Sequence, residues 1–193
     1  MPKEDWIANP VHEILKKAGL WNLPTNLHSV LDVACGLSLK SKFLDVPIRV
    51  GVDIFKPYLQ AIESNVPYIP ICYDVTKLED LFLPKTFDIV YALDIIEHIE
   101  KVQSIQLIDS CKKIAKYAVI IETPNGYIPQ DIDIQGFSAH YFQTHRCGFT
   151  VKELENLGFQ CVVRDYRMSD AKRHSHLEVD QNIQLIDAIY YCH

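Results

Sequence analysis

The sequence lacks the long apolar segment that would hold a protein in a membrane or direct it out of the cell. Its longest apolar runs, such as residues 87–93 and 117–121, have the length of strands and fall far short of the roughly 20 residues that cross a bilayer. Residues 1–6 are rich in charge and no apolar core follows them, so we expect no signal peptide. We therefore expect a cytoplasmic protein with no membrane partner.

Neither a surplus of basic residues nor a regular cysteine pattern is present. The 19 Lys and Arg against 25 Asp and Glu give a formal net charge of −6, which argues against nucleic acid as a partner because phosphate binding relies on cationic side chains. The six cysteines form no C-x-x-C pair, so their spacing supports neither a disulfide framework nor a zinc site. Scattered cysteines are typical of small apolar core residues in a reducing compartment.

Glycine is scarce where a dinucleotide-binding turn would need it. The chain has seven glycines, and only Gly36 follows the first apolar run, where the fingerprint G-x-G-x-x-G has three. No P-loop lysine pattern is present either. A turn lined with acids is poor for a pyrophosphate but acceptable for a ligand that carries a sulfonium and an ammonium. These features count against a dinucleotide cofactor.

The remaining composition is that of an ordinary globular protein. With 193 residues, 48% of them apolar and 23% charged, the chain is long enough for one domain with a sizeable core. No linker or composition break is evident, so we expect a single domain over residues 1–193. Its first 20 residues are typical of a helix, with Asn9 as the N-cap, Pro10 in the first turn and Gly19 past the end. Residues 1–26 would form a helical lid segment.

Seven apolar runs are expected to form strands. The first five do not alternate with polar residues, which is typical of parallel strands covered on both faces. These runs are residues 30–33, 49–53, 68–74, 87–94 and 117–122, and the last two strands are expected over 159–166 and 183–192. Helix-capable segments at 39–44, 57–64 and 102–116 lie between the first five runs and give βαβ units. The pattern predicts an α/β protein with a doubly wound, Rossmann-like sheet.

Two helices have distinct sequence signals. The segment 102–116 has apolar residues every three or four positions, which predicts one buried face made of Val102, Ile105, Ile108, Cys111 and Ile114 or Ala115. Further on, Thr150 and Glu153 have the spacing of a capping box, and the helix that they begin would end at Gly158.

Acidic residues stand at regular intervals, each near the end of an apolar run. Asp32, Asp53, Asp74 and Asp94 are 21, 21 and 20 residues apart. Because the carboxyl ends of parallel strands lie on one edge of a sheet, where ligands bind, we expect these carboxylates to line one cleft. The acid that ends the second strand can accept hydrogen bonds from both ribose hydroxyls of a nucleoside, and the acid that ends the third can accept one from an adenine amino group. Gly36 lets the backbone approach such a ligand closely.

Four motifs along this pattern resemble those of class I S-adenosylmethionine-dependent methyltransferases. Residues 30–36 (VLDVACG) resemble the first motif, 50–53 (VGVD) the second acidic motif and 72–75 (CYDV) the adenine-side motif. Residues 87–99 (FDIVYALDIIEHI) are similar to the fourth-strand segment of the branch with ubiquinone-type and sugar-type small-molecule methyltransferases. The motifs occur in order at matching spacing, although the family usually has glycine in place of Ala34 and often in place of Ser38.

The resemblance implies a mostly parallel seven-stranded sheet whose last strand lies antiparallel beside the fifth. It also implies S-adenosylmethionine as the cofactor, held by residues of the four motifs. By this resemblance, Asp32, Ala34, Cys35 and Gly36 would cradle its methionine end, Asp53 would hold the ribose hydroxyls, Ile54, Asp74 and Val75 would contact the adenine, and Leu93 would lie under the sulfonium.

Residues 123–149 form a long irregular stretch that contains three of the seven glycines. Residues 123–126 (TPNG) resemble the turn after the fifth strand in the same branch, where an asparagine can reach toward the substrate. The aromatic residues of the stretch either wall an acceptor pocket or form a small satellite core. They are Tyr127, Phe137, Tyr141, Phe142 and Phe149.

Two histidines are the candidates for a catalytic base, because histidine is the usual general base near neutral pH. His98 follows Glu97 after the fourth strand, and His145 begins a segment (HRCGFT) that resembles the stretch before the substrate-side helix of sugar-type methyltransferases. A hydrogen-bonded structural histidine is the alternative for each, and His140 is the weaker candidate. Glu97 with His98, or Glu122 with the later histidines, could be combined as metal ligands, but no spacing supports this and no metal is expected.

These features together predict S-adenosylmethionine-dependent methyl transfer to a small-molecule acceptor, with a hydroxyl favoured over nitrogen or carbon. A non-catalytic module that binds the cofactor or a nucleotide is the first alternative, because Ala34 and Ser38 depart from the family pattern. A nucleotide-dependent oxidoreductase is the second, and the missing glycines count against it. The sequence leaves a homodimer open.

Overall fold

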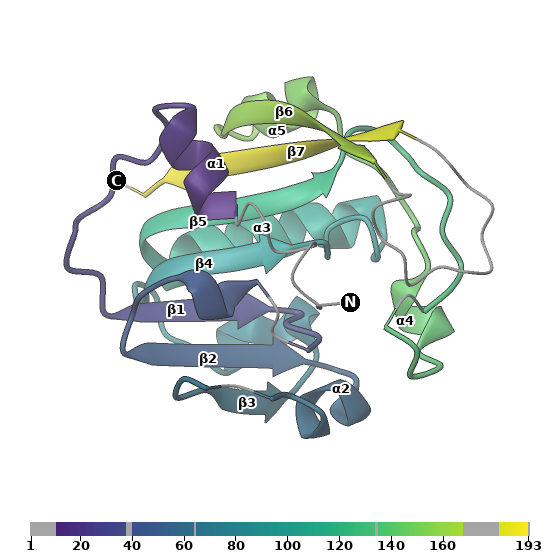
Figure 1. Ribbon diagram of the computed structural model, residues 1–193, viewed down its shortest axis with the longest axis horizontal. Coiled ribbons are helices and arrows are strands. Elements are labelled where there is room, and N and C mark those ends of the chain that lie inside the picture. Colours follow the sequence, from purple (N-terminus) through teal and green to yellow (C-terminus); the bar gives the residue numbers. More distant parts are fainter. Residues whose placement is uncertain (1–10, 38–39, 64, 134, 168–181, 193) are drawn as a thin grey trace.

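The computed structural model describes residues 11–37, 40–63, 65–133, 135–167 and 182–192. Its strands form one seven-stranded sheet in the order β3-β2-β1-β4-β5-β7-β6 (Figure 1). The parallel strands are β1 (Ser29–Val33), β2 (Ile48–Asp53), β3 (Ile69–Cys72), β4 (Phe87–Leu93) and β5 (Ala115–Pro124). Strand β7 (Asn182–Tyr191) lies antiparallel between β5 and β6 (Gln160–Arg167). The predicted mostly parallel sheet with an antiparallel last strand beside the fifth is confirmed.

The central strands are buried on both faces, which is why their sequences do not alternate. All seven residues of β4 are buried. Val90 and Ala92 point into one core cluster, whereas Ile89, Tyr91 and Leu93 point into a second cluster on the other face. A strand with two apolar faces needs an unbroken apolar run.

Helices cover both faces of the sheet, as the doubly wound prediction requires. Helix α1 (Val11–Lys17) lies in front of the sheet in Figure 1 and α3 (Lys101–Ile114) lies behind it. The other elements are short: the 3-10 turns η2 (Ser41–Phe43) and η3 (Val75–Asp80), and the helices α2 (Lys56–Gln60), α4 (His140–Gln143) and α5 (Val151–Asn156). No helix of the described segments is long and apolar enough to cross a membrane.

The buried face of α3 differs from the predicted one. Val102 is 68% exposed, and the buried residues are Ser104, Leu107, Ile108, Cys111 and Ile114. The Ser104 hydroxyl donates a hydrogen bond of 2.6 Å to the carbonyl of Ile96. This bond lets a polar residue take a place on the buried face, for which the apolar pattern had predicted Val102. The helix also ends two residues early, because β5 begins at Ala115.

The other helix predictions have mixed outcomes. The capping box of Thr150 and Glu153 is present and begins α5, and Gly158 follows the helix with a φ of 88°. The predicted helices at 57–64 and 39–44 shrink to α2 and the 3-10 turn η2, whereas α4 and η3 were not predicted.

The N-terminal segment packs on the sheet in its described part. Val11 and Leu15 of α1 belong to one core cluster, and Trp21 packs against the same cluster. The Tyr191 hydroxyl at the end of β7 donates to the carbonyl of Leu20 and accepts from the backbone N–H of Asn22. Residues 11–26 therefore lie on a sheet face and toward the amino ends of the parallel strands. The predicted cap at Asn9 and Pro10, like residues 1–8 of the predicted lid, falls outside the described residues.

The turn after β1 shows why glycine is usual where Ala34 stands. Ala34 has a φ of 54°, in the left-handed region that an L residue with a Cβ adopts only at a cost. Gly36, two residues later, has a φ of 51° and carries no such penalty. Ser38, the other departure from the pattern, lies outside the described residues.

Replacing Ala34 by glycine should relieve this backbone strain. We expect Ala34→Gly to raise the free energy of unfolding by roughly 0.5–1 kcal/mol, measured by urea denaturation. Ala139 has a φ of −84°, so Ala139→Gly serves as the matched control and should lower stability. A loss of stability in Ala34→Gly would contradict the strained conformation of this turn.

Candidate functional site

The turns after β1 and β2 meet at the carboxyl edge of the sheet. The carboxylate of Asp53 accepts a hydrogen bond of 2.9 Å from the Gly36 N–H and one of 2.7 Å from the Phe55 N–H. The N–H of Cys35 donates to the carbonyl of Val52 over 3.1 Å. One buried carboxylate thus holds both turns in place.

Asp32 and Cys35 are also buried in this turn. Burial raises the pKa of Asp32 to about 6, against hydrogen bonds from Ser41 and Tyr68 that lower it, and the neighbouring Asp53 raises it further. Burial likewise raises the pKa of the Cys35 thiol far above its usual range. Cys35 is therefore a neutral packing residue, while Asp32 offers a buried carboxyl group whose hydrogen-bond partners are the hydroxyls of Ser41 and Tyr68.

The remaining predicted cofactor residues lie along the same edge. Ile54 is 45% exposed beside Asp53, whereas Val75 and Leu93 are buried. The Asp74 side chain caps η3 by accepting from the N–H and the hydroxyl of Thr76, at 3.0 and 2.8 Å. Asp32 and Asp53 thus lie together, whereas Asp74 is occupied by its cap.

Asp94 belongs to a chain of charges that sequence reasoning missed. The Lys40 ammonium bonds both Asp94 and Glu122, and Arg164 bonds Glu122 and Asp187 at 2.7 Å each. These residues come from the turn after β1, the ends of β4 and β5, and strands β6 and β7. The one signal in the sequence was an acid, Asp187, inside an otherwise apolar run; its partners are set by strand pairing.

Burial and charge act in opposite directions on this network. Burial alone would raise the pKa of Glu122, but Lys40 and Arg164 together lower it to about 2. Asp187 is fully buried and lies next to Glu122, and its pKa is raised to about 7, chiefly by burial. The network therefore depends on its two cations.

Removing one cation should uncover this dependence. Arg164→Ala leaves Glu122 and Asp187 buried without their shared partner, and we expect a loss of about 3–5 kcal/mol in the free energy of unfolding at about pH 8. Without the guanidinium, burial keeps the pKa of Asp187 above that of an aspartate in the unfolded chain, and Glu122 loses one of the two cations that lower its pKa, so the folded state binds protons more readily. The deficit relative to the unsubstituted protein should shrink as the pH falls toward about 5.

Urea denaturation at both pH values measures this effect. Lys113→Ala is the control, because Lys113 and its ion-pair partner Glu79 are both about half exposed and lie 2.9 Å apart. It should cost less than about 1 kcal/mol at either pH. A deficit in Arg164→Ala that does not change with pH would show that lost packing, and not buried charge, is responsible.

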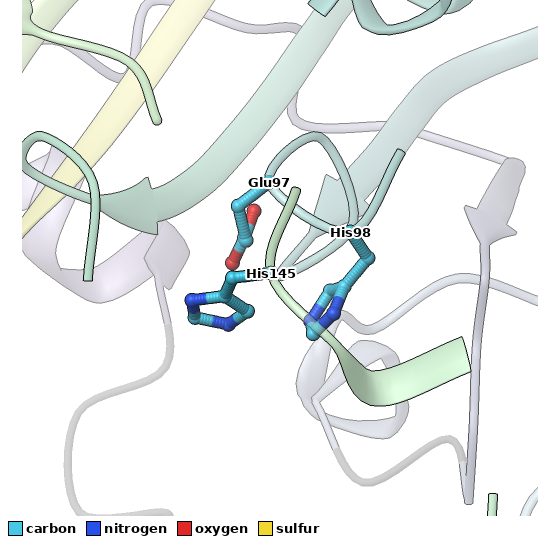
Figure 2. Close-up of side chains that lie close together, drawn as sticks. All are labelled: Glu97, His98 and His145. Carbon is cyan, nitrogen blue, oxygen red and sulfur yellow. The ribbon is translucent and has the colours of Figure 1, made fainter. Parts of the chain in front are cut away.

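The structure brings both catalytic candidates together. His98 lies in the turn after β4 and His145 in the segment after α4, and their rings meet edge to face with centroids 4.6 Å apart. The carboxylate of Glu97 points toward the same space (Figure 2). One potential ligand atom from each of the three lies within 4.8 Å of the others. His140 lies apart from them, exposed, where its Nδ1 accepts a hydrogen bond from the Asp133 N–H.

Backbone contacts fix the position and the tautomer of His145. Its N–H donates to the carbonyl of Gln130 over 2.8 Å, and the next residue, Arg146, donates its N–H to the carbonyl of Glu97 over 2.7 Å. The His145 Nδ1 lies 2.6 Å from the carbonyl of Ile128. Because a carbonyl only accepts, Nδ1 carries the proton and Nε2 keeps its lone pair.

Burial also controls the protonation of the three side chains. It lowers the pKa of His98 to about 3, with further lowering by His145, and it lowers the pKa of His145. Burial, together with the nearby Asp94, raises the pKa of Glu97 to about 8, and the Thr123 hydroxyl donates to this carboxyl over 2.9 Å. Both imidazoles are therefore neutral near pH 7 and present lone pairs.

The aromatic residues after β5 pack mainly as a satellite core. Phe137 packs edge to face on Tyr58, and Phe142 packs on Phe55, with ring centroids 5.4 and 5.8 Å apart. Phe149 is fully buried in the main core, while Tyr127 and Tyr141 are exposed. The contacts favour the satellite-core interpretation over a pocket wall.

Asp133 organises this segment and was missed from the sequence. Its carboxylate accepts from the Tyr58 hydroxyl at 2.6 Å and from three backbone N–H groups, those of Gln135, Phe137 and Ala139, at 2.7 to 2.9 Å. The loop is thereby held against α2, and the Gln135 side chain lies over Gly36. The side chain of Asn125 donates to the side chain of Gln184 on β7 over 3.2 Å.

The strand order and the antiparallel seventh strand define the fold as that of class I S-adenosylmethionine-dependent methyltransferases. Residues 31–117 match the family model described as a methyltransferase domain. The matched region, slightly less than half of the chain, resembles a methyltransferase domain, and the fold is shared with methyltransferases that depend on S-adenosylmethionine (SAM). The branch of the class is not specified by these matches.

Solved structures share this fold at low sequence identity. A SAM-dependent methyltransferase from Archaeoglobus fulgidus is 17% identical, with 98% of this chain and 97% of that chain covered and a TM-score of 0.60. One from Methanosarcina mazei is 12% identical, with 89% and 95% covered and a TM-score of 0.60. Magnesium protoporphyrin IX methyltransferase from Synechocystis PCC 6803 with bound SAM is 18% identical, with 97% and 79% covered and a TM-score of 0.56. No curated protein sequence matches the chain.

Proposed function

We propose that this protein transfers the methyl group of SAM to a hydroxyl group of a small-molecule acceptor. The observation that carries the proposal is the His98 and His145 pair, which lies beyond the end of β4 with both rings neutral and the Nε2 of His145 unprotonated. A hydroxyl keeps its proton near neutral pH, so it needs such an activating group more than an amine does.

The turn after β1 fits the methionine end of the cofactor. Gly36 has no side chain and a left-handed backbone, so a ligand can approach it closely once the Gln135 side chain, which lies over it, turns aside. Asp32 is a buried carboxyl with a raised pKa, so it would bind an ammonium group strongly. Ala34 and Cys35 would complete this cradle as neutral walls. When bound there, SAM supplies a methyl group already activated by its sulfonium.

The turn after β2 fits the nucleoside. Both oxygens of Asp53 accept one backbone N–H each, and each oxygen keeps a second lone pair for a ribose hydroxyl. The exposed side chain of Ile54 offers an apolar surface for the adenine ring, and Asp74 with Val75 would lie on the adenine side. Leu93 would lie beneath the sulfonium.

The chain's own residues then position and activate the acceptor. His145 is fixed by backbone bonds on both sides, so Nε2 keeps a constant position relative to the end of β4. A fixed neutral imidazole can lower the barrier of a transfer to oxygen, and a constant position lowers it further by holding the reacting groups close. The formal charge of −6 supports a small molecule over nucleic acid as the acceptor.

We also propose that the protein acts in the cytoplasm as a single domain. All six cysteines are free, which suits a reducing compartment. A homodimer stays a prediction from the sequence.

The assignment of Asp53 can be tested through binding of S-adenosylhomocysteine, the cofactor product. We expect the product to raise the melting temperature of the protein, and Asp53→Asn to weaken its binding about tenfold or more, because one charged acceptor of the ribose hydroxyls is lost. Isothermal titration calorimetry measures the dissociation constant. Asp109→Asn is the control, since Asp109 is an exposed acid on α3, and unchanged binding in Asp53→Asn would refute the ribose contact.

The role of the histidine pair can be tested through turnover. With a panel of small alcohols and phenols, His145→Ala should lower kcat by about 10²- to 10⁴-fold, and the affinity for S-adenosylhomocysteine should change less than about twofold. The rate of S-adenosylhomocysteine formation, measured by mass spectrometry at saturating acceptor, gives kcat. His28→Ala, which removes an exposed imidazole near the start of β1, should leave turnover unchanged.

Two other results would decide against parts of this proposal. Full turnover in both His145→Ala and His98→Ala would remove the pair from the mechanism. Tight binding of the product without transfer to any member of the panel would favour the non-catalytic binding module.

A further inference from the structure

Glu97, His98 and His145 form a cluster with the composition of a metal site. Among the residues that the structure describes, they are the group of three ligand-type side chains whose ligand atoms come within 4.8 Å of one another. Two come from the turn after β4 and one from the segment after α4, almost fifty residues later in the chain. Figure 2 shows the carboxylate and both rings directed toward a shared space.

We propose that Glu97, His98 and His145 together bind one divalent metal ion, and that zinc matches this set of ligands best. Two imidazole nitrogens and one carboxylate oxygen are the donor set of a catalytic zinc site, which keeps further positions open for oxygen ligands. Magnesium and calcium prefer a shell made of oxygens alone.

An unpaired nitrogen supports the site independently of the spacing. His98 is buried, and its Nδ1 has no hydrogen-bond partner in the protein. The backbones of Thr144 and Gln143 already hydrogen-bond the His98 ring, so Nδ1 is the nitrogen that keeps a free lone pair. A buried polar atom without a partner costs free energy, and a bound cation would remove that cost.

The surroundings of the other two side chains also match those of metal ligands. The Ile128 carbonyl accepts from Nδ1 of His145, which fixes the ring and directs a lone pair to Nε2; metal-bound histidines commonly have such a backbone partner. The Thr123 hydroxyl donates to one oxygen of Glu97 and leaves the other oxygen available. Each of the three side chains therefore keeps one donor atom for the ion.

The backbone holds the two halves of the site together. The Arg146 and Cys147 N–H groups both donate to the carbonyl of Glu97, at 2.7 and 3.2 Å, and the Arg146 side chain bonds the carbonyl of His98. A zinc ion with bonds of about 2.1 Å needs ligand atoms no more than roughly 4 Å apart. Since the present spread is at most 4.8 Å, small side-chain rotations suffice to close the site.

The role of the ion rests on the proposed function and deepens it. A cation held here would bind the acceptor hydroxyl at an open position and lower the pKa of its proton, which would pass to water. The two histidines would then activate the acceptor as ligands of the ion.

The test measures metal binding by the full chain, separately from activity. After removal of metal with a chelator, zinc is titrated in competition with a chromophoric chelator. We expect one zinc ion per chain, and at least about a 100-fold loss of affinity in Glu97→Gln and in His145→Ala, because even changes beyond the direct ligands cost about 10- to 100-fold. His28→Ala should bind zinc as the unsubstituted protein does.

Cobalt(II) distinguishes this site from one made by the cysteines. Cobalt bound to nitrogen and oxygen should give weak visible bands and no intense thiolate charge-transfer band, and Glu97→Gln should abolish the visible bands. Glu97→Gln keeps the shape of the side chain and an acceptor for Thr123, so we expect it to fold. Circular dichroism checks this, and His98→Asn is the second variant.

Three results would overturn the proposal. They are no zinc binding by the unsubstituted chain, equal affinity in Glu97→Gln and His145→Ala, and a thiolate band with cobalt. Binding of S-adenosylhomocysteine is measured in parallel and separates the two proposals. Product binding without zinc binding would remove the metal site alone, whereas zinc binding at the cluster without product binding would support the metal site and refute the proposed methyl transfer.

Discussion

The parallel pairing of five strands, of which the central β1, β4 and β5 are buried on both faces, is the constraint on which the rest of this structure depends. It places the carboxyl ends of β1 to β5 on one edge, and the polar groups that follow those strands must therefore find partners among themselves. Asp53 does so by accepting two backbone N–H groups from two different turns. The same edge also collects Asp32, Glu97 and Glu122, all of which are buried.

This edge has two regions, in which the buried acids have different hydrogen-bond and ion-pair partners. On the side of β1 and β2, backbone N–H groups and neutral hydroxyls are the partners, so the acids retain capacity for a ligand that carries hydroxyl and ammonium groups. On the side of β4, β5 and β7, lysine and arginine neutralise the acids in a fixed chain of ion pairs. The first region is thus suited to the cofactor and the second to holding the sheet edge together.

The cluster of Glu97, His98 and His145 lacks a full set of either kind of partner. The segment after α4 docks on the turn after β4 through the backbone of Glu97, and this contact brings two neutral imidazoles against a carboxyl group. Neither backbone nor lysine completes the set, because His98 keeps an unpartnered nitrogen. This incomplete pairing is the physical reason to look for a cation at this place, and the resemblance of the motifs alone gives no such reason.

Local patterns in the sequence were sufficient for the strands, their parallel arrangement, the capping box at Thr150 and the turn at Gly36, because burial on both faces and capping act on neighbouring residues. The buried face of α3 was mispredicted at Val102, because a pattern of apolar residues does not include serine. Ser104 is nevertheless buried, since its hydroxyl bonds to the Ile96 carbonyl outside the helix. Likewise, the pairing of His98 with His145 and of Arg164 with Glu122 and Asp187 depends on contacts between residues more than twenty positions apart in the chain.

The sequence by itself determined which residue types stand at the ends of the strands. Only the tertiary structure decided which of them meet, because register, loop docking and the left-handed turn at Ala34 are set by packing between segments far apart in the chain.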